Sequence, residues 1–178
     1  MKKKFWTSDK VVSFVAIVVS VFSLFIFVKQ TNIIEEQNHL SVMPYLLLES
    51  SNNAYENEFK IEIVNHGVGP AIIQERLLYY KGEEYDMEFV DFLKDVAPGT
   101  DSINVISSST LQPGFALPAG ASRQILKIGG SKKSYDDFMK FMNMTRTDDF
   151  QYVIKYKSIY GDNWKITSQN EVPEKLED

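Results

Sequence analysis

The longest apolar segment of the chain spans residues 11–28, which are eighteen uncharged residues. A helix of this length extends about 27 Å, close to the thickness of the hydrocarbon core of a bilayer. The segment is longer than the apolar part of a typical signal peptide, and no small-x-small cleavage site follows it. We therefore expect an uncleaved membrane anchor, rather than a signal peptide or the buried helix of a soluble protein.

Cationic residues flank this segment unequally. Residues 1–10 contain four lysines, whereas Lys29 alone follows closely, ahead of Glu35 and Glu36. The positive-inside rule then keeps residues 1–10 in the cytoplasm and exports the chain beyond residue 28. The sequence predicts a signal anchor of the cell membrane with an extracytoplasmic C-terminal domain.

Small residues recur along one side of the expected span, at Ser13, Ala16, Ser20 and Ser23. Small side chains let two helices approach closely in lipid, so this stripe predicts self-association of the chain. The alternative is that the serines donate hydrogen bonds to carbonyl groups of their own helix. Both interpretations remain open at this stage.

Beyond the anchor, the apolar pattern changes from a helical period to short runs with strand-like alternation. Residues 29–43 form a polar stalk, in which Ile33, Ile34 and Leu40 either continue the helix or bind the base of the domain; Pro44 ends any helix. Apolar and charged residues alternate at 59–64, which is typical of a half-buried strand. We expect the other strands at 44–49, 71–80, 102–109, 111–117, 122–128, 150–160 and 164–167, the last two as a hairpin.

Two segments have helical spacing instead. Residues 83–96 are acidic and end at Pro98 and Gly99, and a second helix should begin with Ser134 as its cap. Short strands separated by turns predict an antiparallel β-sandwich of immunoglobulin-like type over residues 44–169, with one or two short helices. Residues 170–178 form a charged tail that we expect to be frayed.

Composition narrows the classes of function. Residues 1–30 hold five of the 19 cationic residues and one of the 24 anionic residues, so residues 31–178 carry 14 and 23, a net charge of −9. This acidity argues against nucleic acid as a partner, because such binding needs clustered cations. The absence of cysteine excludes disulfides, thiolate catalysis and cysteine-based zinc sites.

Three motifs carry a resemblance to known proteins. They are Ile61-Glu-Ile-Val-Asn-His-Gly-Val-Gly-Pro-Ala71, Leu117-Pro-Ala-Gly120 and Tyr156-Lys-Ser-Ile-Tyr-Gly-Asp162. Together they resemble small bacterial proteins that have one N-terminal span and an immunoglobulin-like β-sandwich. The resemblance implies a fold and a mode of membrane attachment, and it transfers no catalytic residue.

Candidate chemical groups are few. The acidic residues of 83–95 suggest a calcium site, but the spacing of an EF-hand loop is missing, so a solvated helix face is the alternative. Residues 129–134 (Gly-Gly-Ser-Lys-Lys-Ser) lack the order of a phosphate loop and are better explained as a strand-to-helix connection. The two histidines, His39 and His66, are too few for a metal site and are not placed for a catalytic triad. We predict no cofactor, no metal and no enzymatic activity.

The favoured hypothesis is a membrane-anchored binding or scaffolding module with a protein partner. Its binding loop would comprise Asn65, His66, Gly67 and Gly69, with the helix around 134–144 as a second surface. In that helix Phe138, Met139, Phe141, Met142 and Met144 either pack in the core or form a partner groove.

The alternative hypothesis is a membrane effector, for example of a prokaryotic defence system. Its domain would bind a signal and drive oligomerisation through the anchor helix. Arg123, Lys132 and Lys133 would then be the first contacts for an anionic ligand.

Overall fold

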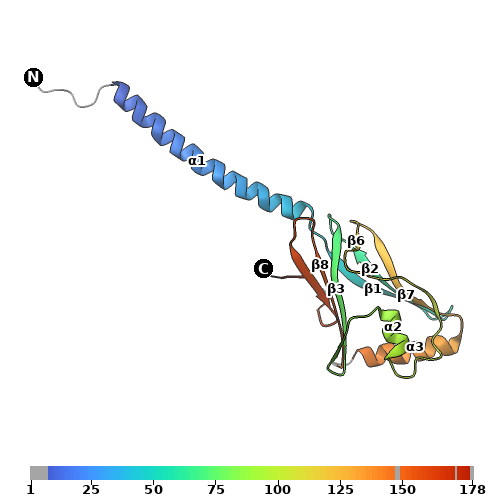
Figure 1. Ribbon diagram of the computed structural model, residues 1–178. Coiled ribbons are helices and arrows are strands. Elements are labelled where there is room, and N and C mark those ends of the chain that lie inside the picture. The colour runs from blue at the N-terminus through green and yellow to red at the C-terminus, as the bar shows by residue number, and fades with distance from the viewer. Residues whose placement is uncertain (1–7, 147–148, 171, 177–178) are drawn as a thin grey trace, which may run out of the picture. The chain divides into compact units, whose positions relative to one another are not determined.

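The computed structural model describes residues 8–146, 149–170 and 172–176 (Figure 1). The chain divides into two compact units, residues 1–40 and residues 41–178. The lysines at positions 2–4, on which the predicted orientation partly depends, lie outside the described residues.

The described residues of the first unit form a single helix, α1 (Ser8–Ser41), of 34 residues, whose last residue is the first of the second unit. It is about 50 Å long at 1.5 Å per residue, and none of its residues is buried. Its most apolar 18-residue window has a mean hydropathy of 2.9, so α1 is long and apolar enough to cross a membrane. The polar residues from Lys29 onward continue the same helix to Ser41, so the helical extension predicted for the stalk is confirmed.

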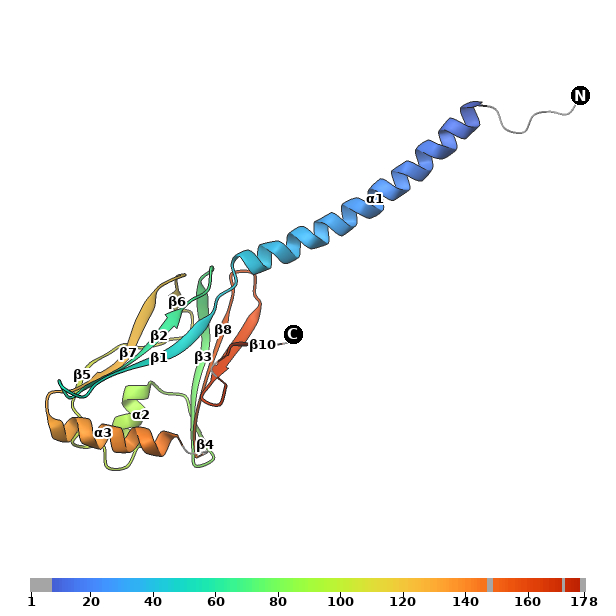
Figure 2. The same ribbon diagram turned by 180° about the vertical axis from the view of Figure 1, so that it is seen from behind.

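The second unit, the domain, contains two antiparallel sheets (Figure 2). The first sheet has four strands in the order β1-β2-β7-β5. Their bounds are Leu46–Asn53 for β1, Glu58–Asn65 for β2, Ser122–Ile128 for β7 and Val105–Ser108 for β5. β1 pairs with β2 on one side and lies at the edge of the sheet.

The second sheet has the order β10-β9-β8-β3-β4. Its strands are Glu174–Lys175 (β10), Asn163–Thr167 (β9), Phe150–Lys157 (β8), Ala71–Tyr80 (β3) and Glu83–Tyr85 (β4). The short strand β6 (Ala116–Leu117) pairs with the start of β3. The strands predicted at 71–80 and 122–128 are confirmed with the same bounds, and β8 and β9 form the predicted hairpin.

The core lies between the two sheets, and strand alternation explains it. In β2, Phe59, Ile61 and Ile63 are buried while Lys60 and Glu62 form an ion pair on the other face, at 2.7 Å. The facing side chains of the second sheet include Ile73, Ile154 and Ile166, which belong to the same core cluster. Burial of these apolar side chains is the main stabilising term for the domain.

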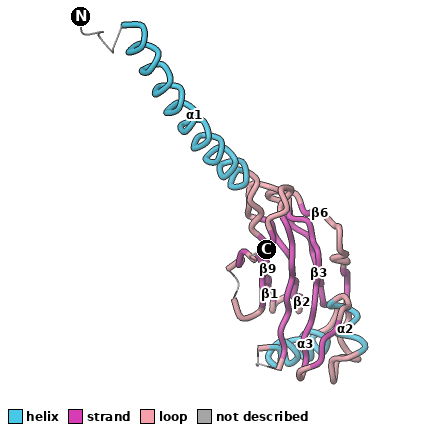
Figure 3. Tube along the Cα trace, turned by 60° about the vertical axis from the view of Figure 1, so that its left-hand side comes forward, coloured by secondary structure: helices cyan, strands magenta, loops and turns pink. Residues whose placement is uncertain are grey.

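Two helices lie at the same end of the domain, as Figure 3 shows. They are α2 (Phe89–Asp95) and α3 (Lys132–Thr145). Aromatic rings join them to the sheets: Phe138 of α3 lies 5.2 Å from Phe59, and Phe92 of α2 lies 5.6 Å from Phe150, measured between ring centroids. The domain is thus a mixed structure of strands and helices.

Three local predictions were wrong. Residues 83–96 are not one helix, because Lys81 and Gly82 both have positive φ and form a tight turn that pairs β4 with β3. The cap of α3 is Ser131, whose side chain accepts a hydrogen bond from the N–H of Ser134. The tail is not frayed throughout, since β10 pairs with β9.

Candidate functional site

The turn at residues 65–70, which we predicted to be a binding loop, is occupied by the chain itself. It contacts residues 42–46, the segment that follows α1, and we call the two segments together the clamp. The N–H of Val68 donates to the carbonyl of Met43 at 3.0 Å, and the N–H of His66 donates to the carbonyl of Tyr45 at 2.8 Å. These bonds attach the segment that precedes β1 to the end of β2.

Asn65 is the centre of the clamp and is completely buried. Its Oδ1 accepts hydrogen bonds from the N–H of Tyr45 at 3.1 Å and of Gly67 at 3.0 Å. Its Nδ2 donates to the carbonyls of Gly69 at 2.9 Å and Leu117 at 3.0 Å. Both polar atoms of the amide are therefore used inside the domain, and the predicted ligand contact through Asn65 is wrong.

Gly67 and Gly69 are required by close packing of backbones. A Cβ on Gly67 would lie 2.4 Å from the carbonyl oxygen of Met43, and one on Gly69 would lie 1.9 Å from that of Val42. Neither glycine has positive φ, so backbone conformation is not what requires them. Their role is to let residues 42–45 cross the turn.

His66 is the member of the predicted loop whose side chain is half exposed. Its Nε2 lies 2.7 Å from Oε1 of Glu49, and both side chains are about half exposed. Val68 at the tip of the turn is also exposed. The clamp thus presents little more than these two side chains to solvent.

Tyr156 of β8 anchors the other side of the clamp. It is fully buried, and its Oη accepts a hydrogen bond from the N–H of Leu46 at 3.4 Å. Burial raises the pKa of the Tyr156 hydroxyl to about 12. The sequence placed Tyr156 in a strand but contained no signal for this contact, because the two residues are 110 positions apart.

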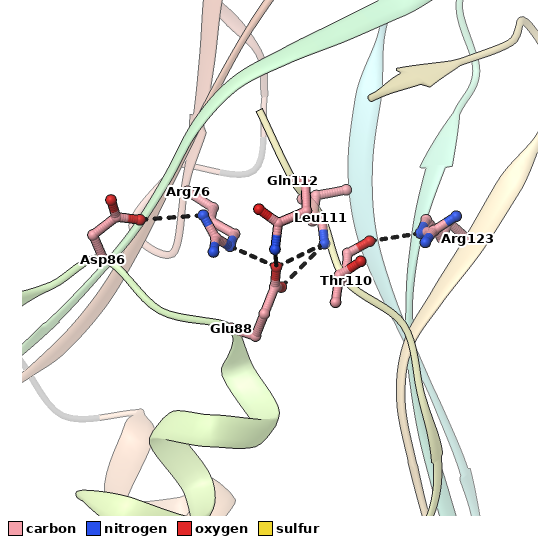
Figure 4. A network of polar contacts seen from close by, with 7 residues as sticks. All are labelled: Arg76, Asp86, Glu88, Thr110, Leu111, Gln112 and Arg123. Carbon is pink, nitrogen blue, oxygen red and sulfur yellow. Dashed lines mark hydrogen bonds and ion pairs between the residues drawn. The ribbon is translucent and has the colours of Figure 1, made fainter. Parts of the chain in front are cut away.

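A buried ion pair, Arg76 with Glu88, forms a second polar cluster inside the domain (Figure 4). Nε of Arg76 lies 2.9 Å from Oε1 of Glu88, although its N–H bond is not aimed at that oxygen. Glu88 also accepts hydrogen bonds from the N–H of Leu111 at 3.0 Å and from Nε2 of Gln112 at 3.0 Å. The carboxylate is therefore satisfied from three directions.

A β-bulge explains why an arginine points between the sheets. The pairing of β3 with β8 shifts register between Ile73 and Glu75, so one extra residue is inserted. Side-chain alternation then moves by one position, and Arg76 faces inward together with Leu78 while Glu75 faces solvent. The bulge lies directly before Glu75 and Arg76, the two charged residues of the strand.

The segment at 109–115 crosses from the first sheet to the second and is held from both sides. Glu88 binds Leu111 and Gln112, while Nε of Arg123 donates to the carbonyl of Thr110 at 2.8 Å. The guanidinium of Arg123 also lies 4.3 Å from the ring centroid of Phe115. Arg123 thus holds this crossing segment in place. Its guanidinium already contacts Thr110 and Phe115, and an anion would have to share the group with them.

A cavity of about 60 Å³ lies beside the ion pair. It is lined mainly by apolar side chains of both sheets, among them Leu48, Ile61, Ile125, Leu78, Tyr152 and Ile154. For comparison, an engineered apolar cavity that binds benzene has a volume of about 150 Å³. We interpret this space as a packing gap beside Arg76 and not as a ligand site.

The acidic residues of 83–95, which suggested a calcium site, do not gather at one place in the structure. The acidic residues of 83–95 are divided between β4, a connecting segment and α2, with Glu88 buried and Asp86 paired with Arg76 at 3.1 Å. Within the described part of the chain, no group of three or more His, Asp or Glu side chains is arranged to hold a metal. Residues 129–134 do connect β7 to α3, as expected.

The three predicted anion contacts do not form one site. Arg123 is the second residue of β7, whereas Lys132 and Lys133 follow the other end of that strand. The five steps from Arg123 to Ile128 alone span about 17 Å of strand. Lys132 and Lys133 are exposed in the first turn of α3.

The methionine and phenylalanine residues of α3 mostly pack in the core. Phe138 and Phe141 are buried, and Met139 and Met142 pack partly buried against them. Met144 alone in this set is exposed. This arrangement supports the core interpretation over a partner groove.

In α1, the serines of the predicted stripe differ from one another. The hydroxyls of Ser13 and Ser20 donate to the carbonyls of Asp9 and Ala16 in their own helix, each at 2.8 Å. Ser23 makes no hydrogen bond through its hydroxyl within the described residues. Back-bonding therefore accounts for two of the three serines, and the stripe as a whole stays a prediction.

Neither a protein-family model nor a curated protein matches this chain.

Proposed function

We propose that the chain is a single-pass membrane protein that presents its domain at the membrane surface as a binding or scaffolding module. The observation that carries this proposal is α1, none of whose apolar residues is buried. Exposed apolar surface of this extent is unfavourable in water and favourable in lipid. The lysines of residues 1–10 support an N-terminus in the cytoplasm and a domain outside it.

The domain is best explained as a variant of the immunoglobulin-like sandwich. In that fold the first sheet has the strand order A-B-E-D and the second has C-F-G. Assigning A to β1, B to β2, C to β3, D to β5, E to β7, F to β8 and G to β9 reproduces both orders. In this assignment α2 lies in the connection before D and α3 in the connection between E and F.

Recognition of a protein, rather than catalysis, is the activity that the domain supports. Its acidic net charge disfavours nucleic acid, and the buried side chains of Asn65 and Glu88 make their hydrogen bonds within the domain. The free edge of β1 offers a surface for an extended segment of a partner. All eight residues of β1 are in regular register with β2, and the strand contains no lysine or proline that would block such an edge.

The outward-facing groups of this edge can be assigned. The N–H of Leu46 points away from β2 to the hydroxyl of Tyr156. Because backbone direction alternates along an antiparallel strand, the N–H groups of Leu48, Ser50 and Asn52 point the same way. These are the groups that an added strand would bind.

The alternative function, a membrane effector that oligomerises through its helix, is supported by one observation. α1 continues without interruption from its apolar part to Ser41, and the clamp begins with the next residue. A continuous helix joined directly to clamped backbone suits the transmission of a signal. The exposed Lys132 and Lys133 are the remaining candidates for an anionic signal.

The anchor is tested by fractionation and by topology. We expect full-length protein to stay in the membrane pellet after extraction with alkaline carbonate, and a reporter fused after Asp178 to be active outside the cytoplasm. Recovery as a soluble monomer without detergent would refute the anchor. A reporter active only in the cytoplasm would favour the effector alternative.

The recognition surface is tested at Ser50, whose N–H is free of β2 in this assignment. Ser50→Pro removes that donor from the outer edge, and Ser50→Ala retains it. We expect a membrane protein cross-linked to the wild-type domain in intact cells to be lost in Ser50→Pro and kept in Ser50→Ala. Equal cross-linking in the two variants would exclude the β1 edge.

A further inference from the structure

A seven-residue repeat runs along α1 and shares two residues, Ala16 and Ser23, with the stripe of small residues. Branched apolar side chains recur at intervals of seven, at positions 12, 19, 26, 33 and 40, as Val, Val, Ile, Ile and Leu. Four residues after each of the first four come smaller or amide side chains, at positions 16, 23, 30 and 37, as Ala, Ser, Gln and Gln. The alternating spacing of four and three is that of a coiled-coil seam. We call these nine residues the seam.

The seam crosses from the apolar part of α1 into its polar part. Ile33 and Leu40 lie beyond the last residue of the apolar segment, Val28, yet 52% and 59% of their respective surfaces are exposed. In water, exposed side chains of this kind gain free energy when another surface covers them. A second helix that continues past the bilayer would supply that surface.

Ser23 provides an independent indication inside the apolar part. Ser13 and Ser20, which flank the seam, donate their hydroxyl protons within their own helix. Ser23, which is on the seam, does not do so in the described structure. A hydroxyl without an acceptor is unfavourable in hydrocarbon, so its position indicates an acceptor on another helix.

We propose that α1 forms a parallel coiled coil with α1 of a second copy of this chain, along the seam from Val12 to Leu40. This inference rests on the proposed membrane anchoring, because insertion in one orientation makes the two helices parallel. A strict repeat of seven drifts by about 20° per heptad on a straight helix, so a left-handed supercoil keeps the seam in contact. Ala16 and Ser23 allow close approach within lipid.

Gln30 and Gln37 favour one register of the two helices. In a parallel pair each amide faces its counterpart, and two amides satisfy one another as donor and acceptor. A shift by one heptad would keep one amide pair, Gln30 with Gln37. It would place the other Gln30 opposite Ser23 and leave the other Gln37 beyond the end of the seam. Polar residues at seam positions are the usual device for fixing register in coiled coils.

Because the chain contains no cysteine, single cysteines report on this contact directly. Gln37→Cys lies on the seam. Glu35→Cys is only two residues away, so it lies at nearly the same position along the helix axis, but it is on the opposite side of the helix. With oxidant added to native membranes, we expect about fivefold more disulfide-linked dimer from Gln37→Cys than from Glu35→Cys, since a disulfide needs Cα atoms within about 7 Å.

A second pair of substitutions tests the contact inside the apolar part. In the Gln37→Cys background, Ser23→Phe places a large side chain on the seam, whereas Val21→Phe places it on the opposite face. We expect the first to lower the yield of dimer by about threefold, because bulky groups prevent close helix approach, and the second to leave it unchanged.

The outcomes separate this inference from the proposed function. If Gln37→Cys and Glu35→Cys cross-link equally, or neither does, while both stay in the membrane pellet, the seam is refuted and the anchor is retained. If the variants and the wild type are all recovered in the soluble fraction, membrane anchoring itself fails. An equal effect of Ser23→Phe and Val21→Phe would also refute the seam.

Discussion

The side-chain oxygen of Asn65 accepts a hydrogen bond from the backbone N–H of Tyr45 at 3.1 Å, so a residue at the end of β2 holds the residue that precedes β1. The same amide donates to Gly69 and Leu117. A turn that has the composition of an exposed binding loop is therefore a structural joint at the start of the domain.

Replacing the Asn65 side chain should destabilise the domain strongly. Asn65→Ala leaves several buried backbone groups without partners, and each such group costs about 1–3 kcal/mol. We expect the free energy of unfolding to fall by about 3 kcal/mol or more, measured by urea titration of full-length protein in mild detergent with tryptophan fluorescence. Asn53→Ala, at an exposed asparagine that bonds to Glu56, is the control and should change it by less than about 0.5 kcal/mol. Similar losses in both variants would contradict the role of Asn65.

Residues 42–45 cross closely over the turn that contains Gly69. We therefore predict that replacing Gly69 by alanine destabilises the domain more than the same change at a glycine with open space around it. Gly69→Ala would place a methyl group 1.9 Å from the carbonyl oxygen of Val42, and the backbone must move to accept it. Gly120→Ala meets no atom within 4 Å, although its φ of +69° adds strain of about 1 kcal/mol. We expect Gly69→Ala to lower the melting temperature by at least twice as much as Gly120→Ala. Limited proteolysis should then cut within residues 41–46 in Gly69→Ala first.

The ion pair between Arg76 and Glu88 predicts how stability changes when one of its charges is removed. Glu88→Ala leaves the charge of Arg76 buried without its main partner, and such losses typically cost about 3–5 kcal/mol. Asp86→Ala removes a partner whose side chain is 74% exposed, and it should cost less than about 1 kcal/mol.

The double variant Arg76→Leu with Glu88→Leu removes both charges. It should therefore be more stable than Glu88→Ala, and chemical denaturation of the three proteins tests this order. If the double variant is the least stable, the contacts of Glu88 with residues 111 and 112 matter more than the charge pair.

The buried hydroxyl of Tyr156 predicts a loss of stability in alkali. Burial raises its pKa from 10.0 to about 12, so the folded protein keeps a proton that the unfolded chain has already lost between these pH values. The stabilisation is complete below pH 10 and is lost as the pH rises through about 12, with a slope of at most about 1.4 kcal/mol per pH unit from this group.

Tyr156→Phe tests that contribution. The variant lacks the titrating group, so its free energy of unfolding should fall less steeply between pH 10 and 12 than that of the wild type. Urea titrations at several pH values across this range give both slopes. Parallel curves would show that Tyr156 ionises in the folded state as readily as in the unfolded chain.

Much of the local structure followed from the sequence, because it depends on neighbouring residues. The apolar length of α1, the alternation in β2 and the Gly-Asp-Asn turn between β8 and β9 are all signals within a few residues of one another. The β-hairpin of β4 was missed because the acidic residues 83–96 have helical spacing, whereas the tight turn at Lys81 and Gly82 decides the pairing.

The candidate site could be predicted much less well. Asn65, Gly67 and Gly69 were singled out, but as a binding loop. The reason for these residue types lies in contacts with Val42, Met43 and Tyr45, which are twenty or more positions away and which no local pattern reveals. Arg76 and Glu88 carry no signal of burial in the sequence, because a bulge at Gln74 turns Arg76 inward and a crossing segment supplies the partners of Glu88.

The sequence by itself determined that one helix is apolar enough for lipid and that the remainder forms short strands around a core, because both properties are periodic in the chain. Tertiary structure alone decided which polar residues are left for solvent. A buried polar group needs hydrogen-bond partners, and here these partners come from segments that are distant in the sequence. They become neighbours only when the two sheets pack together.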